Sequence, residues 1–244
     1  MTLSGRPSFM VEAYSLGIEG AVPLLFRTVD LRERPDHPDH RFDLVVEPGT
    51  VTAVVGDEDS GVGDMGRYAL GLDQPPSGSV LVFGTDVGTM EYDDLLVFRR
   101  RIGYLQLGDG LLQNLTLRAN IGLPLQYASD HRVKAVESRV EELLARFHLA
   151  DVAGLRPAAV NEEYRRRTAV ARAVALDPGL LVLEAPFDGL TGRAAHELLE
   201  LCRTCRDGSP RTVFIAAQDL GPHVIPLMTR IVHVEDGLAL EGLA

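Results

Sequence analysis

Short apolar runs alternate along this chain with longer stretches that repeat their apolar residues at helical spacing. The runs Val51–Val55, Leu180–Leu183 and Thr212–Ala216 carry almost no polar residues, which is typical of strands buried on both faces of a parallel sheet. Between residues 133 and 149, apolar side chains recur every three or four residues, as on the buried side of an amphipathic helix. Strands that alternate with helices predict an α/β fold with a mainly parallel sheet.

Other parts of the pattern predict smaller units beside this sheet. Pro23–Arg32 alternates as an edge strand does and Arg41–Val46 adds a second strand, so we expect an antiparallel edge subdomain. Residues 111–125 are apolar but contain glycine, proline and asparagine, which predicts a loop-rich stretch inside a helical subdomain of about 105–160. Residues 1–22 form an N-terminal extension of no legible function, followed by one domain over 23–244. Further predicted elements are helices at 65–72, 93–101, 161–176 and 193–206, strands at 79–83 and 102–107, and a hairpin at 231–241.

Composition and charge exclude several classes of protein. With 24 Lys and Arg against 35 Asp and Glu, the net charge is −11, and no basic run offers a footprint for a phosphate backbone. We therefore expect no binding to nucleic acid. No apolar run reaches about 18 residues and the first residues do not resemble a signal peptide, so we expect a cytoplasmic protein.

The turn after the first buried strand has the frame of a phosphate-binding loop without its chemistry. In the pattern GxxxxGK[ST], backbone N–H groups wrap the phosphates, the lysine reaches the terminal phosphates, and the hydroxyl holds Mg²⁺. Here Gly56 and Gly61 supply the glycines, but Val62 occupies the lysine position and Gly63 the hydroxyl position, with Asp64 after it. The pattern predicts a nucleotide site without its cation and without its Mg²⁺ ligand.

Carboxylates crowd the same turn. Unit charges about 4 Å apart interact by roughly 4 kcal/mol at an effective dielectric of 20, so each uncompensated carboxylate opposes a triphosphate. A solvated or partner-facing acidic surface is the favoured interpretation. Two alternatives stay open, which are weak anion binding on the amides of the turn and capture of Ca²⁺ or Mg²⁺ by its carboxylates. The carboxylates are those of Asp57, Glu58, Asp59 and Asp64.

Two pairs of candidate metal ligands have simpler explanations. Cys202 and Cys205 form a CxxC inside a helical pattern, with no second Cys or His pair to complete a zinc site, which favours a structural role. His37 and His40 lie in a proline-containing loop, where histidines are usually solvated. We expect no metal at either pair.

The segment ARAVALDPGLLVLEAPFDGLT, residues 171–191, resembles the region around the second carboxylate motif of the ATP-binding-cassette (ABC) transporter ATPases. In that family a helix, an Asp-Pro break, an apolar strand, an acidic pair, a proline and a Gly-Leu loop follow in this order. The resemblance runs from about Pro23 to the C-terminus and implies a P-loop NTPase-type fold. The family's Asp-Glu pair, which holds Mg²⁺ and orients the attacking water, falls on Glu184 and Ala185.

The signature and switch motifs of the family are placed by spacing, and both depart from the family pattern. The signature loop, whose serine and amides contact the γ-phosphate across a dimer, falls on Asn161, Glu162 and Glu163. Asn161 is also the predicted N-cap of the helix that follows. The switch histidine is replaced by Gln218.

The glutamine loop of the family falls on Leu107, with Gln106 in its place if the register slips by one residue. Residues that shape the fold of this family remain, whereas those that act on phosphate are changed at nearly every position. We therefore interpret the chain as a degenerate cassette. The retained positions are Gly56, Gly61, Gly78, Gly84, Arg172, Pro178, Pro186 and Gly189.

The resemblance implies an ABC transporter subunit that does not hydrolyse ATP and acts structurally or in regulation. We expect no cofactor, with weak binding of ATP and Mg²⁺ as the alternative. The implied partners are a membrane permease subunit, docked in the groove between the two lobes, and a second cassette in a homodimer or heterodimer at the inner face of the membrane. Residues 115–127 are most similar to cassettes of lipid or Mce-type transporters. A residually ATP-binding ABC ATPase is the first alternative function, and a soluble interaction or regulatory protein outside transport is the second.

Overall fold

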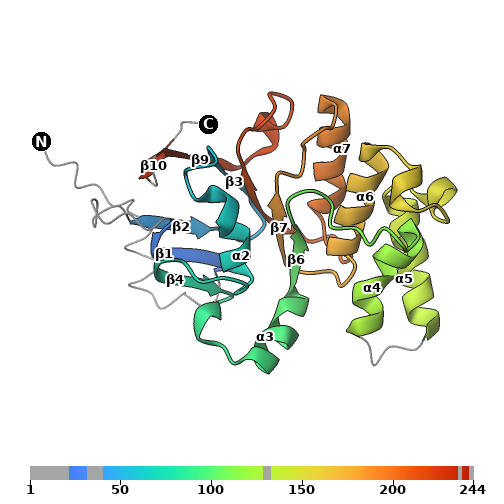
Figure 1. The fold of residues 1–244 in the computed structure, drawn as a ribbon, viewed down its shortest axis with the longest axis horizontal. Coiled ribbons are helices and arrows are strands. Elements are labelled where there is room, and N and C mark those ends of the chain that lie inside the picture. The colour runs from blue at the N-terminus through green and yellow to red at the C-terminus, as the bar shows by residue number, and fades with distance from the viewer. Residues whose placement is uncertain (1–21, 32–40, 129–132, 236–237, 242–244) are drawn as a thin grey trace, which may run out of the picture.

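Two β-sheets and a group of helices make up the fold, which the computed structural model describes for residues 22–31, 41–128, 133–235 and 238–241. Figure 1 shows a smaller sheet on one side, helices α4 to α6 on the other, and the strands of a larger sheet between them. Residues 1–21, which form nearly all of the predicted extension, and the two loop histidines at 37 and 40 lie outside the described residues. No helix in the described ranges is long and apolar enough to span a bilayer.

The larger sheet has six strands in the order β10-β9-β3-β8-β7-β6. Every neighbouring pair is parallel except the β9–β10 hairpin, which is antiparallel. The residues of β3, β7 and β8 are buried at every position, as their apolar sequences predict. The mainly parallel sheet and the closing hairpin are therefore confirmed. The strands are β3 (Val51–Gly56), β6 (Ile102–Leu105), β7 (Leu180–Glu184), β8 (Thr212–Ala217), β9 (Arg230–Glu235) and β10 (Leu238–Glu241).

The smaller sheet is antiparallel, with four strands in the order β2-β1-β4-β5. The prediction that the first strand lies at an edge is wrong, because β1 pairs with β2 on one side and β4 on the other. Its alternation arises because Leu24 and Phe26 face the core between the sheets, where the Phe26 ring packs against Phe42 and Phe214. The strands are β1 (Leu24–Asp30), β2 (Phe42–Val46), β4 (Ser77–Val82) and β5 (Thr85–Asp86).

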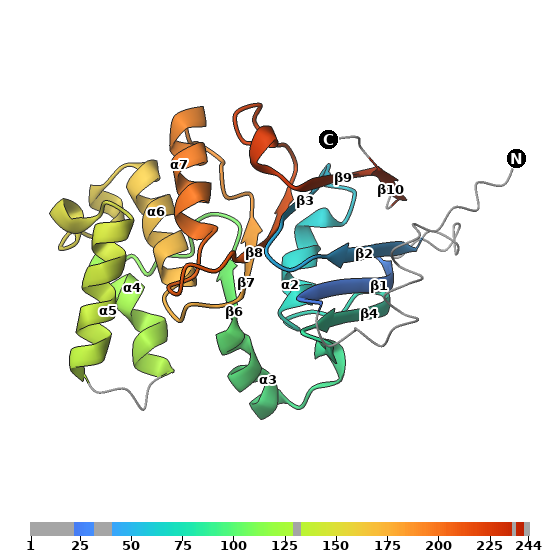
Figure 2. The same cartoon turned by 180° about the vertical axis from the view of Figure 1, so that it is seen from behind.

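Helices cover the sheets unevenly, as Figure 2 shows from behind, with α4 to α7 gathered at one end. On α5 the buried side chains Val140, Leu143 and Leu144 form the apolar face that the sequence predicts. The helices are α2 (Met65–Ala69), α3 (Tyr92–Phe98), α4 (Leu117–Tyr127), α5 (Val133–Arg146), α6 (Glu162–Ala173) and α7 (Gly192–Cys202). Single 3₁₀ turns lie at Val62–Asp64, Val87–Thr89, Arg99–Arg101, Ala150–Val152, Pro157–Ala159 and Ile225–Leu227.

Helix α4 corrects the prediction of a loop-rich stretch over 111–125. The Thr116 side chain accepts the backbone N–H of Ala119 at 3.1 Å and so caps the helix. The helix continues past Pro124, although proline cannot donate a backbone hydrogen bond. Its residues 117, 121 and 125 follow one another at helical spacing and are buried, so packing outweighs the loss at the proline.

Candidate functional site

Strands β3, β8, β7 and β6 lie side by side in that order and run parallel, so their carboxyl ends meet at one edge of the sheet. Ligands of open α/β sheets bind at this edge. The turn 56–64 follows β3, Gln218 follows β8, Glu184 and Ala185 come at the end of β7, and Leu107 follows β6. The fold thus brings four of the motifs placed by sequence to the same edge.

The turn over 56–64 is held together by its own hydrogen bonds. Ser60 is fully buried, and its Oγ donates to the carbonyl of Asp57 at 2.6 Å and accepts the backbone N–H of Val62 at 3.2 Å. Gly61 adopts φ +82°, and a Cβ there would collide with the backbone of Leu31, so glycine is required. A phosphate in this turn would have to compete with Ser60 for the N–H of Val62.

The side chains of the turn offer a phosphate no positive charge. Val62 exposes only 1% of its surface and packs in the core between the two sheets, so methyl groups stand where the pattern has an ammonium. A Cβ added at Gly63 would meet nothing within 4 Å, which leaves open space at the hydroxyl position. Asp57, Glu58, Asp59 and Asp64 are all exposed around the turn.

The carboxylate of Glu184 is already occupied by protein donors. The Tyr104 hydroxyl donates to Oε1 at 2.7 Å, and the backbone N–H of Leu107 donates to Oε2 at 2.8 Å. The same carboxylate lies against Gly66 of α2, where any Cβ would collide with it. Burial, and then the hydrogen bond to Glu184, raises the pKa of the Tyr104 phenol, so it remains a donor at neutral pH. Two of the roughly four acceptor positions of this carboxylate are therefore already taken by protein donors, one on each oxygen.

Ala185 and Gln218 lack the groups that would activate water. Ala185 takes a left-handed backbone conformation with φ +42°, its N–H donates to Ala216, and its carbonyl accepts from Arg166 at 3.3 Å. Gln218 is exposed directly after β8. Neither a methyl group nor a carboxamide can take a proton from water at neutral pH.

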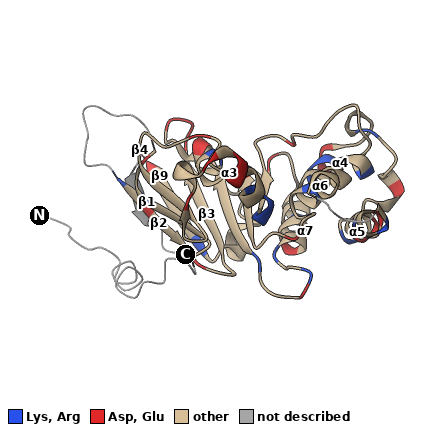
Figure 3. Ribbon diagram, turned by 90° about the horizontal axis from the view of Figure 1, so that it is seen from below, with Lys and Arg blue, Asp and Glu red and all other residues tan. Residues whose placement is uncertain are grey.

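The residues at the signature position open helix α6. Asn161 Oδ1 accepts the backbone N–H three residues later at 3.0 Å, which confirms the predicted N-cap. Glu162 pairs with Arg166 at 3.6 Å, and Glu163 pairs with Arg167 at 2.8 Å. Both acidic side chains are therefore balanced by arginines one turn along the same helix. Figure 3 colours the basic residues, including those of α6, blue.

A comparison with known families identifies the family to which the motifs at this edge of the sheet belong. The model of the ABC transporter family matches residues 40–188, more than half of the chain and including the turn 56–64, the end of β7 and the start of α6. This chain belongs to the ABC transporter family.

Several curated proteins resemble this ABC cassette. The methionine import ATP-binding protein MetN of Rhizobium meliloti (strain 1021) is 33% identical over 193 residues, which is 79% of this chain and 53% of the relative. The sulfate/thiosulfate import ATP-binding protein CysA of Synechococcus elongatus is 32% identical over 177 residues, or 72% of this chain and 50% of the relative. The cassette spans about half the length of these relatives.

Solved structures show the same fold at lower sequence identity. A dimeric bacterial ABC transporter cassette superposes with a TM-score of 0.78 and 22% identity, covering 88% of this chain and 96% of that one. The cbiO1 protein from Clostridium perfringens, part of an ABC transporter complex, superposes with a TM-score of 0.76 and 16% identity, covering 90% and 87%. The α/β fold of the P-loop ABC ATPases, with its antiparallel sheet and helices, is confirmed.

The sequence did not identify two side chains that shape the site of this cassette. Tyr104 holds the carboxylate of Glu184, and Arg166 reaches from α6 to the carbonyls of Gly108 and Ala185. The run of arginines at 165–167 was the available signal, but a sequence does not reveal which of them turns inward. Among the described residues, no group of three or more His, Cys, Asp or Glu side chains could hold a metal ion.

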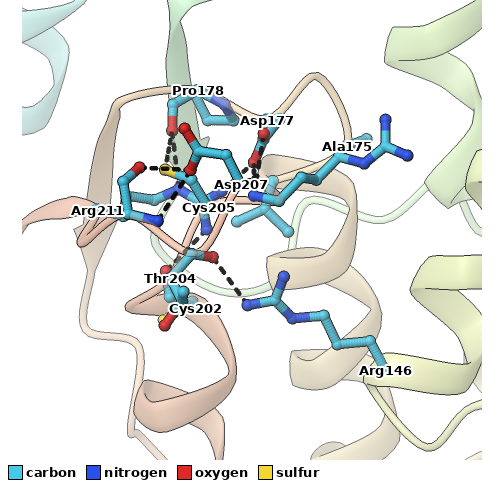
Figure 4. Close-up of polar contacts among 12 residues, drawn as sticks. Arg146, Ala175, Asp177, Pro178, Cys202, Thr204, Cys205, Asp207 and Arg211 are labelled. Atoms are coloured by element: carbon cyan, nitrogen blue, oxygen red, sulfur yellow. Dashed lines mark hydrogen bonds and ion pairs between the residues drawn. The ribbon is translucent and has the colours of Figure 1, made fainter.

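The CxxC pair of the cassette has a structural environment, shown in Figure 4. Both cysteines are free, and burial raises the pKa of the Cys202 thiol to about 12, so it stays protonated at neutral pH. The helix predicted over 193–206 ends at Cys202, because Arg211 bonds the Cys202 carbonyl at 2.8 Å and the chain turns back, with Thr204 bridged to Pro210. The pair belongs to a helix end that a buried arginine closes.

Proposed function

We propose that this cassette is an ABC transporter subunit that neither binds nor hydrolyses ATP at physiological concentration and that contributes architecture or regulation to a transport complex. The observation that carries the proposal is that the residue at the lysine position, Val62, is a buried valine while both oxygens of Glu184 already accept protein hydrogen bonds. The ammonium that should neutralise a bound triphosphate is therefore missing, and the carboxylate that should hold its Mg²⁺ is already engaged by two protein donors. The proposed division is an extension over 1–22 and a domain over 23–244, with a helical lobe at about 105–160.

Phosphoryl transfer gives a protein little covalent chemistry to perform, so its catalysis is almost entirely positioning and electrostatic stabilisation. At each position that would supply such stabilisation, this chain has a residue without the required functional group or charge. Val62 brings no charge, Ala185 brings no carboxylate, Gln218 brings no imidazole, and Asp64 adds a like charge. The acidic signature residues Glu162 and Glu163 are paired with arginines of α6, and their carboxylates offer no hydrogen-bond donor to a partner's nucleotide. We therefore propose that these substitutions together abolish ATP hydrolysis.

An exposed apolar surface supports docking onto a membrane permease subunit. Tyr92, Leu96 and Val97 of α3 are 69%, 44% and 58% exposed, although α3 also buries Leu95 and Phe98. Large apolar groups gathered at a surface are typical of interaction sites. The Arg100 side chain reaches the carbonyl of residue 128 at the end of α4, which links the α3 side of this surface to the helical lobe. Further exposed apolar residues are Leu72, Leu107, Leu112 and Tyr127.

We propose that the second partner is another cassette, since a solved relative with this fold is dimeric. In a homodimer of this chain neither composite site would carry a complete set of catalytic groups. In a heterodimer with an intact cassette, one composite site would keep the partner's phosphate-binding loop and face Asn161, Glu162 and Glu163 of this chain. Such a complex would place the cassette at the inner face of the membrane. Lipid is the transported substrate that the sequence favours, whereas the relatives above are named for methionine and for sulfate or thiosulfate.

Phosphate release from Mg-ATP tests the proposal. The purified chain should release inorganic phosphate at the background rate, because no charge holds the triphosphate and no base activates water. Restoring the carboxylate alone, by Ala185→Glu, should leave the rate at background, because the nucleotide is still not bound. A rate above background that survives repurification and is abolished by Gln218→Ala would contradict the proposal.

A further inference from the structure

The loop over residues 107–110 is tied to β7 at its first residue. The backbone N–H of Leu107 donates to Glu184 Oε2 at 2.8 Å, and the other oxygen of that carboxylate accepts from Tyr104, the residue three positions earlier. Glu184 is 7% exposed, so water competes little for either bond. The carboxylate thus fixes both the end of β6 and the start of the loop.

The remainder of the loop is tied to α6 through backbone carbonyls. Arg166 Nη1 donates to the carbonyl at 108 at 2.6 Å, while Arg172 donates to the carbonyls at 109 and 110 at 3.0 and 2.7 Å. Arg165 adds an ion pair with the Asp109 side chain at 3.2 Å. Arg166 is 4% exposed and also donates to the carbonyls at 185 and 188, so it joins the loop, the end of β7 and α6.

In every one of these contacts, both the donor and the acceptor are groups of this chain. Charged donors and acceptors make the stronger hydrogen bonds, and a buried guanidinium that loses its carbonyl partners is left unpaired at high cost. None of the contacts requires a phosphate, a metal ion or a second chain. The loop is therefore held in place by the fold itself.

We propose that Glu184, Tyr104 and Arg166 fix the 107–110 loop in a single conformation that nucleotide does not alter. The consequence is a constant interaction surface, because the loop and its continuation present Leu107 and Leu112, which are 69% and 47% exposed. Leu112 is itself held, since its N–H donates to the buried Asn120 side chain at 2.8 Å. The inference deepens the proposed function, on which it rests, by making docking onto an apolar surface of a membrane subunit independent of ATP.

Amide hydrogen exchange of the full chain, read by mass spectrometry with and without about 1 mM Mg-ATP, tests the inference. In the wild type, exchange at Leu107 and Leu111 should be slow and the same in both conditions. Glu184→Leu should speed exchange at Leu107 by about tenfold or more, because the N–H loses a charged acceptor. Glu184→Gln, which keeps one acceptor, should restore part of the protection. Arg118→Ala removes an exposed ion pair on α4 and should leave the loop unchanged.

The same experiment separates failure of the inference from failure of the proposed function. Protection of residues 56–66 on adding Mg-ATP, with an unchanged loop, would overturn the proposed function and support the fixed loop. Fast exchange at Leu107 in the wild type, or a nucleotide-dependent change there, would overturn the inference. If Glu184→Leu does not fold, two other variants replace it. Tyr104→Phe removes the second donor that holds Glu184, and Arg166→Met removes the bond to the 108 carbonyl. Each should speed exchange in 107–111, and no change in either would also overturn the inference.

Discussion

Replacing Val62, Gly63 and Asp64 together by Lys, Ser and Thr should tighten the binding of Mg-ATP at least tenfold, from a wild-type dissociation constant weaker than about 1 mM. The triple variant adds one positive charge, removes one negative charge and supplies hydroxyl groups at the Mg²⁺ position. Each unit charge near a phosphate contributes roughly 4 kcal/mol at 4 Å and an effective dielectric of 20 before desolvation. A tenfold gain requires only a fraction of that.

The local backbone should accept the substitutions at 63 and 64, whereas the lysine at the buried position 62 must extend its ammonium out of the core toward the turn. The space beside Gly63 is open, and the residue at 64 is exposed, so neither new hydroxyl displaces a packed group. Titration with a fluorescent ATP analogue in Mg²⁺ provides the measurement. The matched control combines Gly63→Ser and Asp64→Thr with Val62→Met, which has a long unbranched side chain without charge. A control that binds as tightly as the lysine variant would show that the missing cation is not the main defect.

Arg211→Met should cost about 3–5 kcal/mol of unfolding free energy, because it leaves two carbonyls unpaired and removes the charged donor of the partly buried Asp177 carboxylate. Arg211 has 0% side-chain exposure and donates to Asp177 at 2.6 Å, to Pro178 at 2.8 Å and to Cys202 at 2.8 Å. Figure 4 shows these bonds joining the start of β7 to the end of α7. For a chain of this length, that cost lowers the melting temperature by about 6–20 °C.

Arg203→Ala is the control for the buried arginine. Arg203 lies in the same turn, is 40% exposed, and pairs with Glu200 at 2.7 Å. Exposed pairs of this kind contribute about 0.2–1 kcal/mol, so its melting temperature should fall by no more than about 4 °C. Thermal unfolding followed by circular dichroism compares the two variants. Equal shifts would mean that Arg211 does not organise this end of the core.

The buried strands of the larger sheet could be predicted because their signal is local. Runs such as Val51–Val55 are apolar on both faces, and the residues that follow them reach one edge of the sheet as a consequence of parallel pairing. The Asn161 cap was likewise predictable, because it depends on residues within one helical turn. The position of β1 was not, because alternation shows that one face is buried and says nothing of how many neighbours a strand has.

The contacts that hold the side chains of the site join residues far apart in the chain, and no sequence pattern predicts such contacts. Glu184 meets Tyr104 across 80 positions of the chain, and Arg166 meets the 108 carbonyl across 58. Helix α4 shows the same limit at Pro124, where burial of three residues one turn apart overrides a residue that normally ends helices. Local chemistry shows which groups are missing, whereas only the fold shows what occupies their place.

A crystal of the wild-type cassette soaked in about 1 mM Mg-ATP tests most directly whether this frame still holds a nucleotide. The predicted result is that residues 60–64 keep the bond from the Val62 N–H to Ser60 and that no triphosphate lies over them. Glu184 should keep its bonds to Tyr104 and Leu107. A well-occupied triphosphate seated on the backbone amides from Gly61 to Asp64, with a metal ion beside Glu184, would contradict the account.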